Sequence, residues 1–302
     1  MYNEFLNELK EKIDASWIKE QEPMKLHTTF RVGGPADVLV TPDAESLPRV
    51  IALCKKYNLS YEIIGNGSNL LVGDKGVRGV VIAMTNRIGE IVCDGEIITA
   101  GAGCTLAQIA VLAAGNGLAG FEFAAGIPGT LGGAVVMNAG AYGGEMKDVI
   151  TSILVLDEDG NQKELSVEEL DLSYRHSCIP EKNYIVLRVT MKLCRGDVGQ
   201  IRAKMAELRE QRLTKQPLEY PSAGSTFKRP EGYFAGKLIM EAGLRGYQVG
   251  GAQVAEKHCG FVINKENATA ADIVTLMKDV SDKVEEQFGV KLEPEVKMMG
   301  EF

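Results

Sequence analysis

The sequence predicts a mixed α+β fold with two domains, and three observations support this prediction. The chain has 302 residues, 45% of them hydrophobic, which is enough for a sizeable core and for more than one domain. Runs of alternating apolar residues joined by Asp-Gly turns predict antiparallel strands before residue 196. A long charged helix begins at Asp197, and helices dominate after it. We therefore expect domains at 1–196 and 197–302.

Composition and charge exclude several classes of protein. The formal net charge of −8 disfavours non-specific nucleic-acid binding, and no basic patch interleaved with aromatic residues opposes this conclusion. No apolar run approaches the 18 or so residues of a membrane span, and the charged, amphipathic N-terminus is unlike a signal sequence, so we expect a cytoplasmic protein. One basic segment, 200–230, is compatible with an anionic ligand or with an ordinary helix surface.

The cysteines and histidines favour neither a disulfide framework nor a metal site. The six cysteines are widely spaced, without a C-x-x-C pair, and lie among apolar residues, which predicts reduced and buried thiols. The three histidines lack the spacing of metal ligands. We expect no metal.

The first elements predict a β-α-β unit. After an amphipathic N-terminal helix, a strand over 36–42 precedes an amphipathic helix over 45–57 and a strand over 61–64. This order predicts that the two strands form a parallel pair.

A polar, glycine-rich loop, GNGSNLLV at 65–72, follows the second of these strands. It lacks the third glycine of G-x-G-x-x-G and no helix follows it, so it is not a Rossmann fingerprint. Backbone N–H groups, together with the side chains of Ser68 and Asn69, still suit a pyrophosphate. A purely structural turn explains the pattern equally well.

Hairpins and one capped helix occupy the middle of the chain. Turns at Asp94-Gly95 and Asp159-Gly160 join alternating strands, and Thr105 caps a helix that ends near Gly115. The remaining elements are expected as strands over 184–193, 261–264 and 290–298 and as helices over 197–216, 234–242 and 269–288.

The stretch FEFAAGIPGTLGGAVVMNAGAYGGE at 121–145 is the centre of the sequence. Ten glycines fall between Gly115 and Gly144 without a Gly-X-Y period, which excludes collagen. A backbone without Cβ atoms can bring its N–H groups close to a phosphate or a flat ring. No acidic residue lies between Glu122 and Glu145, which favours an anionic ligand, although tight turns alone would also use glycine.

Seven motifs in order connect this sequence with a known family. They are TTFRVGGPA, GNGSNLLV, AGIPGTLGGAVVMNAGAYGGE, SYRHS, SAGSTFKRP, GGAQVAEKHCGFVIN and LEPEV, and they cover roughly residues 28–300. In this combination the chain resembles the UDP-N-acetylenolpyruvoylglucosamine reductases, in the shorter class without an inserted tyrosine-bearing loop. The segment after Arg175 is too short for that loop.

The resemblance implies a fold and a cofactor. It implies an FAD-binding domain of the vanillyl-alcohol-oxidase (PCMH) type over 1–196, with subdomains at about 1–85 and 86–196, followed by an α/β substrate-binding domain over 197–302. FAD would be bound non-covalently, and NADPH would be the co-substrate. The cofactor-binding residues implied are Ile64, Gly65, Asn66, Gly67, Ser68, Asn69, Gly126, Gly129, Thr130, Gly132, Gly133, Asn138, Gly140 and Ala141.

The reaction implied is the reduction of an enolpyruvyl ether on a UDP-sugar to UDP-N-acetylmuramate, for peptidoglycan synthesis. Hydride addition leaves carbanion character beside a carboxylate, which a cation can stabilise and a hydroxyl can protonate. In the family these roles fall to residues that match Arg175, Ser225 and Glu295. Substrate contacts are expected from Lys215, Gln253 and Tyr142. We expect a monomer without nucleic-acid or membrane partners.

Two alternatives stay open. An FAD oxidase of the same fold would return electrons to oxygen, and a non-catalytic nucleotide-binding protein would leave the three catalytic candidates incidental. From pattern alone, an Arg after Tyr commonly pairs with surface charges, and a Ser in A-G-S-T commonly caps a turn. A visible spectrum tests both flavoenzyme interpretations, because a colourless protein would contradict them.

Overall fold

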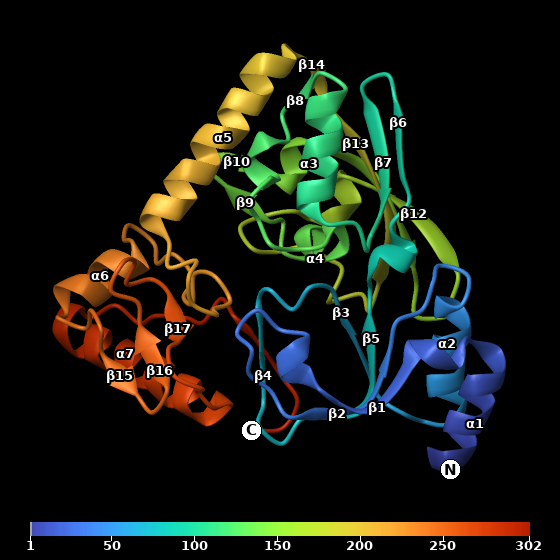
Figure 1. Ribbon diagram of the computed structural model, residues 1–302, viewed down its shortest axis with the longest axis horizontal. Coiled ribbons are helices and arrows are strands. Elements are labelled where there is room, and N and C mark those ends of the chain that lie inside the picture. The colour runs from blue at the N-terminus through green and yellow to red at the C-terminus, as the bar shows by residue number, and fades with distance from the viewer. Residues whose placement is uncertain (1) are drawn as a thin grey trace. The chain divides into compact units, whose positions relative to one another are not determined.

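The computed structural model describes residues 2–302 as two compact units whose segments alternate along the chain (Figure 1). Unit 1 comprises the residues up to Lys19 together with Val38–Asn66 and Val80–Gln211. Unit 2 comprises Glu20–Asp37, Gly67–Gly79 and Arg212–Phe302. The sequence instead predicts two contiguous domains, and the assignment of 1–196 to FAD and 197–302 to substrate stays a prediction.

Five of the helices within residues 2–302 contribute to unit 1, and four of them correspond to predicted helices. They are α1 (Tyr2–Lys12), α2 (Leu47–Lys56), α3 (Leu106–Gly115), α4 (Leu131–Val136) and α5 (Val198–Lys215), the last of which runs past the boundary at Gln211. The Thr105 side chain caps α3, as the sequence predicts, and the structure adds a reciprocal capping box with Gln108. Helix α4 was not expected as an element of its own; it lies within the glycine-rich stretch.

The main sheet of unit 1 is antiparallel, with the order β12-β11-β13-β7-β6. Its strands are β6 (Ile91–Asp94), β7 (Ile97–Gly101), β11 (Ile150–Leu156), β12 (Gln162–Ser166) and β13 (Ile185–Lys192). Both predicted hairpins are confirmed, because β6 pairs with β7 and β11 pairs with β12 in antiparallel register. Helix α4 packs against β13 and β7 of this sheet (Figure 1).

A second sheet has the order β1-β2-β5-β3 and corrects one prediction. Its strands are β1 (Ile18–Pro23), β2 (Pro35–Val40), β3 (Tyr61–Ile64) and β5 (Val77–Ala83). The expected parallel pair between β2 and β3 is wrong, because β5 lies between them and pairs in parallel with β3 from Tyr61↔Val80 to Ile64↔Ala83. The end of β5 is fully apolar and buried, which is typical of a central strand.

Unit 2 contains a small antiparallel sheet, β15-β16-β17, and two helices. These elements are β15 (Gln248–Val249), β16 (Ala252–Val254), β17 (Val262–Asn264), α6 (Ala235–Glu241) and α7 (Ala270–Phe288). Helix α7 packs on all three strands. Its first N–H groups are capped by the Asp74 carboxylate, which accepts from Ala270 N at 2.8 Å and from Ala271 N at 3.0 Å.

A parallel pair of short strands completes unit 2. Strand β4 (Leu70–Val72) pairs with β18 (Lys297–Met299). The strand predicted over 290–298 is therefore mostly wrong, because only its last residues form a ladder. Pro294, which has no N–H to donate, forms an isolated antiparallel bridge with Phe227.

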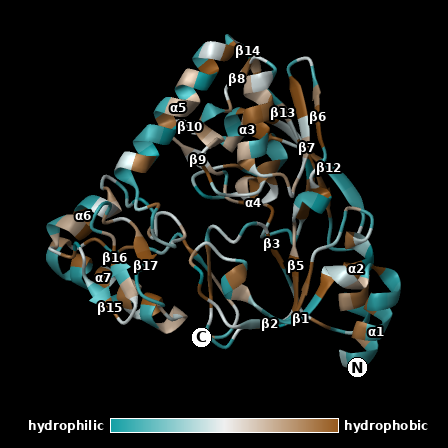
Figure 2. Cartoon of the chain, in the orientation of Figure 1, coloured by the Kyte–Doolittle hydropathy of each residue, from teal (hydrophilic) through white to brown (hydrophobic). Residues whose placement is uncertain are grey.

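Each unit has its own hydrophobic core. In unit 1, Phe5 and Leu9 of α1 belong to the same buried core as strand and helix residues such as Ile82 and Ile109. In unit 2, the buried face of α7 packs with residues of the small sheet and α6. The hydropathy colouring shows β5 and β17 largely brown, in agreement with their burial (Figure 2).

The six cysteines are free, and the predicted burial is correct for four of them. Burial raises the pKa of the Cys54 thiol to about 12. The prediction is wrong for Cys194, which is exposed, and Cys93 is only half-buried. Cys194 lies on β14 (Cys194–Arg195), which pairs with β8 (Leu118–Ala119). Within residues 2–302, no helix could span a membrane, and no group of acidic, His and Cys side chains is arranged to hold a metal ion.

Candidate active site

The glycine-rich stretch 121–145 folds into α4 and a hairpin that presents Tyr142. Strands β9 (Gly140–Ala141) and β10 (Gly144–Glu145) pair around the turn Tyr142-Gly143. Both turn residues have positive φ, +53° and +88°, as a two-residue hairpin turn requires. Tyr142 is 42% exposed at this tip.

A buried hydroxyl without a partner lies where two predicted cofactor loops meet in unit 1. Thr130 is 2% exposed, and its Oγ1 makes no hydrogen bond within residues 2–302. A Cβ on Gly65 would lie 2.1 Å from this oxygen, and one on Gly133 would lie 3.6 Å from it. The Asn66 amide donates to Pro128 O at 3.2 Å and joins the same loops. An unsatisfied buried hydroxyl costs about 1–3 kcal/mol, so this one suits a bound ligand.

Two other glycines of the stretch, Gly132 and Gly140, pack closely against the protein itself. A Cβ on Gly132 would lie 3.0 Å from Ala102 Cβ, next to β7. A Cβ on Gly140 would lie 2.8 Å from both Glu145 Cβ and Gly144 O in the hairpin. Gly126 is exposed, and Gly129 O accepts from Leu106 N. Pattern reasoning treats all these glycines alike, because it cannot separate contact with a ligand from contact with the chain.

The second half of the polar loop belongs to unit 2. Gly67 has φ of +60°, and a Cβ there would lie 2.0 Å from His27 O, so only glycine fits. The Asn69 side chain donates to Glu295 O at 3.2 Å, and Asn69 O accepts from Lys297 N at 2.9 Å. Cofactor candidate Asn69 and catalytic candidate Glu295 are therefore neighbours.

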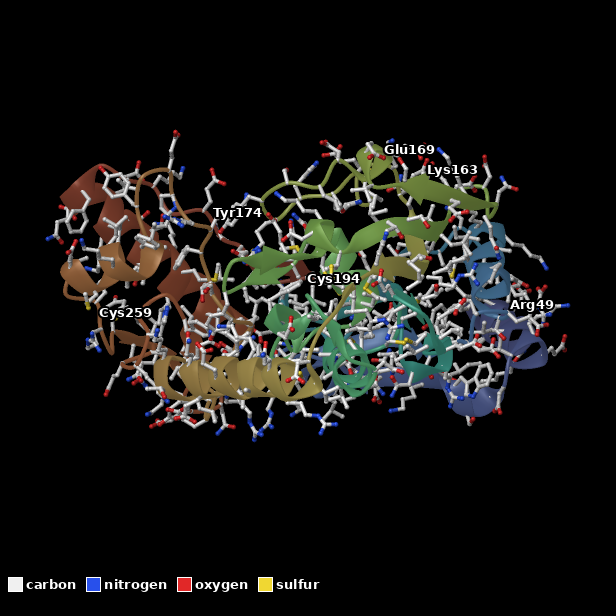
Figure 3. All side chains as sticks on the ribbon, turned by 90° about the horizontal axis from the view of Figure 1, so that it is seen from above. Arg49, Lys163, Glu169, Tyr174, Cys194 and Cys259 are labelled. Atoms are coloured by element: carbon white, nitrogen blue, oxygen red, sulfur yellow. The ribbon has the colours of Figure 1, made fainter. Side chains whose placement is uncertain are left out.

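Arg175 lies in a tight two-residue turn. Ser173 and His176 bridge each other through two backbone hydrogen bonds, with Tyr174 and Arg175 between them. Arg175 has φ of +56°, a conformation that costs a residue with a Cβ about 1–2 kcal/mol. Its guanidinium carbon lies 5.1 Å from the centre of the ring of Tyr174, which is 53% exposed (Figure 3). The turn therefore presents a half-buried cation on a strained backbone.

Asn138 is fully buried and its amide is used inside the protein. Its Nδ2 donates to Glu145 Oε2 at 2.7 Å and to Ser173 O at 3.0 Å, and its Oδ1 accepts from Lys147 N at 2.9 Å. Sequence reasoning places this side chain on a cofactor. The structure links it to the Arg175 turn, which no sequence pattern indicated.

Ser225 and Glu295 lie on two paired backbone segments of unit 2. Glu295 N donates to Thr226 O at 2.8 Å, and Lys228 N donates to Glu293 O at 2.8 Å. Thr226, which is fully buried, accepts from Val262 N at its Oγ1. Ser225 itself is exposed, and Glu295 is half-buried. The backbone hydrogen bond between Glu295 and Thr226 therefore brings the Glu295 segment next to Ser225, which precedes Thr226 and has an accessible hydroxyl.

The two predicted substrate residues of unit 2 differ in burial. Gln253 in β16 is 8% exposed and donates to Gln248 Oε1 across the hairpin at 3.3 Å. Gly250 and Gly251, which begin its motif, close that hairpin against Asp272 of α7. Lys215, the last residue of α5, is exposed.

Comparisons with known proteins agree on one family. Residues 216–299 match the family described as UDP-N-acetylenolpyruvoylglucosamine reductase, C-terminal domain, and residues 35–166 match FAD binding domain. The UDP-N-acetylenolpyruvoylglucosamine reductase of Agathobacter rectalis is 57% identical, with 100% of both chains covered.

Solved structures give the same result for the fold. The UDP-N-acetylenolpyruvylglucosamine reductase of Thermus caldophilus is similar with a TM-score of 0.79 and 38% identity, over 92% of this chain and 97% of that one. An alkyldihydroxyacetonephosphate synthase is similar with a TM-score of 0.51 and 18% identity, over 65% of this chain and 42% of that one. The second likeness concerns the fold alone, and the predicted α+β architecture of the PCMH type is confirmed.

Proposed function

Because the chain belongs to the UDP-N-acetylenolpyruvoylglucosamine reductase family, we propose that it reduces the enolpyruvyl ether of UDP-N-acetylglucosamine enolpyruvate to UDP-N-acetylmuramate. FAD is the bound cofactor and NADPH is the electron donor. We further propose that the enzyme works as a cytoplasmic monomer in the synthesis of peptidoglycan precursors.

The unpartnered Thr130 hydroxyl, with Gly65 and Gly133 beside it, supports FAD as the ligand of unit 1. Glycine allows the backbone to approach a phosphate or a flat ring, and the Thr130 hydroxyl can still form a hydrogen bond with a ligand. When bound, FAD supplies the hydride that adds to the vinyl carbon of the substrate. The other proposed contacts come from the polar loop 64–69 and from Gly126, Gly129, Gly132, Gly140 and Ala141.

The proposal assigns three roles to the chain's own residues. Arg175 lies beside the substrate carboxylate, where its charge stabilises the carbanion character that hydride addition creates. Ser225 donates a proton from Oγ to that carbon, and Glu295 orients the donor. Lys215, Gln253 and Tyr142 contact the substrate. The observation that carries this assignment is the exposed Ser225 hydroxyl next to the Thr226–Glu295 hydrogen bond.

Anaerobic spectroscopy tests the proposed function directly. NADPH should bleach the yellow protein, and addition of the enolpyruvyl UDP-sugar should restore the colour. Recovery with oxygen but not with the UDP-sugar would favour the oxidase alternative, and a colourless protein would contradict both. If NADPH and substrate use one pocket in turn, double-reciprocal plots should be parallel; intersecting lines without substrate inhibition would contradict that scheme.

Arg175→Ala tests the proposed charge stabilisation. We expect reoxidation of the reduced enzyme by substrate to slow about 10²–10³-fold, because removal of one preorganised group that stabilises a developing anion typically slows a reaction by this factor. Reduction by NADPH should change little, since that step builds no charge on the substrate. Stopped-flow measurement of both steps decides the matter, and equal losses in both would contradict the assignment.

A further inference from the structure

We propose that Asn138 is a positioning residue. It fixes the Arg175 turn, and through Arg175 it affects the rate at which the substrate is reduced. The inference rests on the proposed function of Arg175. It also replaces the expectation that the Asn138 side chain binds the cofactor.

The hydrogen bonds of Asn138 leave it no donor for a ligand. A side-chain amide has two N–H groups, and those of Asn138 are directed to Glu145 Oε2 at 2.7 Å and Ser173 O at 3.0 Å. Its carbonyl oxygen accepts from Lys147 N at 2.9 Å. The side chain is 0% exposed, and its backbone has φ of +39°. Burial and full use of the donors indicate a structural contact within the chain.

The Ser173 carbonyl is the atom through which Asn138 reaches Arg175. That oxygen also accepts from His176 N at 3.2 Å, the bond that closes the turn around Arg175. Arg175 has φ of +56°, and such a conformation persists only when the surroundings hold it. Loss of the Asn138 amide would remove one of the two hydrogen bonds to the carbonyl at the base of this turn.

A second hydrogen bond holds the other side of the turn. Ser177, which is 1% exposed, donates from its hydroxyl to Val136 O at 2.9 Å. Val136 is the last residue of α4, and Asn138 follows it by two positions. The end of α4 therefore holds the Arg175 turn both before Tyr174 and after His176.

The neighbouring charges orient the Asn138 amide. Glu145 accepts from Nδ2 with one oxygen, and its other oxygen lies 2.7 Å from Lys147 Nζ. A carboxylate acceptor strengthens the hydrogen bond from the amide. Aspartate at position 138 would have the same size, but its carboxylate would face the Glu145 carboxylate and the Ser173 carbonyl. Asn138→Asp is therefore the most damaging isosteric change.

Separate measurement of the two half-reactions tests the inference. For Asn138→Ala we expect FAD content and reduction by NADPH to stay within about twofold of the parent. The maximal rate of reoxidation by the enolpyruvyl UDP-sugar should fall about 10- to 100-fold, which is the cost of a misplaced reacting group, with a smaller change in the half-saturating concentration. If Asn138→Ala gives no folded protein, Asn138→Ser is measured in its place.

A double-mutant cycle distinguishes positioning from independent effects. If Asn138 acts through Arg175, then Asn138→Ala should change reoxidation by less than about twofold when Arg175→Ala is already present. Ile153→Val, in the core of the same unit, is the control for lost stability, and it should lower the melting temperature without altering the ratio of the two half-reactions.

Three results would overturn the inference. They are an unaltered reoxidation rate in Asn138→Ala, an effect that persists in the Arg175→Ala background, or a loss of FAD in place of a loss of rate. If Arg175→Ala alone leaves reoxidation unchanged, the proposed role of Arg175 fails as well. If only the Asn138 variants behave as the parent, the proposed function stands and the positioning role alone is wrong.

Discussion

The Arg175 turn of unit 1 and the Ser225 segment of unit 2 are held by different kinds of hydrogen bond. The turn is anchored by two side-chain hydrogen bonds, one from the Asn138 amide to Ser173 O and one from the Ser177 hydroxyl to Val136 O at the end of α4. The Ser225 segment is held by backbone bonds on both sides, from Glu295 N to Thr226 O and from Thr226 N to Gly260 O. Substitutions of single side chains should therefore displace Arg175 more easily than Ser225.

Ser225→Ala should have the largest effect of any substitution in the backbone-held segment. A proton donor contributes about 10²–10⁴ to a rate, and we expect reoxidation of the reduced variant to slow by this factor while reduction by NADPH is unchanged. The melting temperature should match the parent, because backbone bonds hold the segment. Stopped-flow reoxidation beside a melting curve measures both quantities.

The control for this prediction is Ser225→Cys, which keeps a proton to donate and should recover part of the rate. If Ser225 only caps a turn, Ala should cost about 1 kcal/mol of stability and leave reoxidation nearly unchanged. That result would remove the proposed proton donor.

Thr226→Val sharpens the comparison from the side of stability. Valine keeps the shape of Thr226 but leaves the buried Val262 N–H without its acceptor, which should lower the free energy of unfolding by about 1–3 kcal/mol. Because Ser225 stays on its backbone ladder, the ratio of reoxidation to reduction rates should stay within about twofold of the parent. Denaturant unfolding and stopped flow supply the two numbers; a changed ratio would show that backbone bonds alone do not position Ser225.

Gly65→Ala tests the unpartnered hydroxyl of unit 1. The added Cβ would lie 2.1 Å from Thr130 Oγ1, so the hydroxyl must move. Losing one hydrogen bond of about 1.4 kcal/mol corresponds to a tenfold weaker affinity for FAD, measurable by titration of the apoprotein. Gly115→Ala, where the new Cβ meets no atom within 4 Å, is the matched control. Equal affinities in both variants would contradict a role of Thr130 in FAD binding.

The smallest effect concerns His258, which accepts from Gly260 N at 3.1 Å beside the Ser225 segment. Burial lowers the pKa of this imidazole below its usual 6.5. The unfolded chain then binds a proton more readily than the folded chain. The contribution of His258 to the free energy of unfolding is therefore complete above about pH 6.5 and is lost as the pH falls through the folded pKa. His258→Asn, which keeps an acceptor, should reduce the difference in melting temperature between pH 7.5 and 5.5. An unchanged difference would assign the pH dependence to other groups.

Local patterns in the sequence predicted most of the elements. The hairpins at Asp94-Gly95 and Asp159-Gly160 and the cap at Thr105 are set by neighbouring residues, and they are confirmed. The order of the strands could not be predicted in the same way. Strand β5 lies between β2 and β3, and this position depends on pairing between segments that are far apart in the sequence.

The same distinction applies to the candidate site. The glycine-rich stretch and the polar loop were found from composition, since both are local features. The hydrogen bonds from Asn138 to Ser173 and from Asn69 to Glu295 join residues that are 35 and 226 positions apart. No pattern within a window of sequence contains that information, so the link between α4 and the Arg175 turn emerged only from the fold.

The pairing of β4 with β18 has a consequence for the order in which the protein is made. Asn69 and Glu295, at the start of this pairing, are 226 residues apart, and Lys75 donates to the carbonyl of Phe302. At a synthesis rate of about 5–20 residues per second, the segment 67–79 waits about 10–45 s on the ribosome for its partner strand. Unit 2 therefore cannot complete this pairing until residues 295–299 have been synthesised.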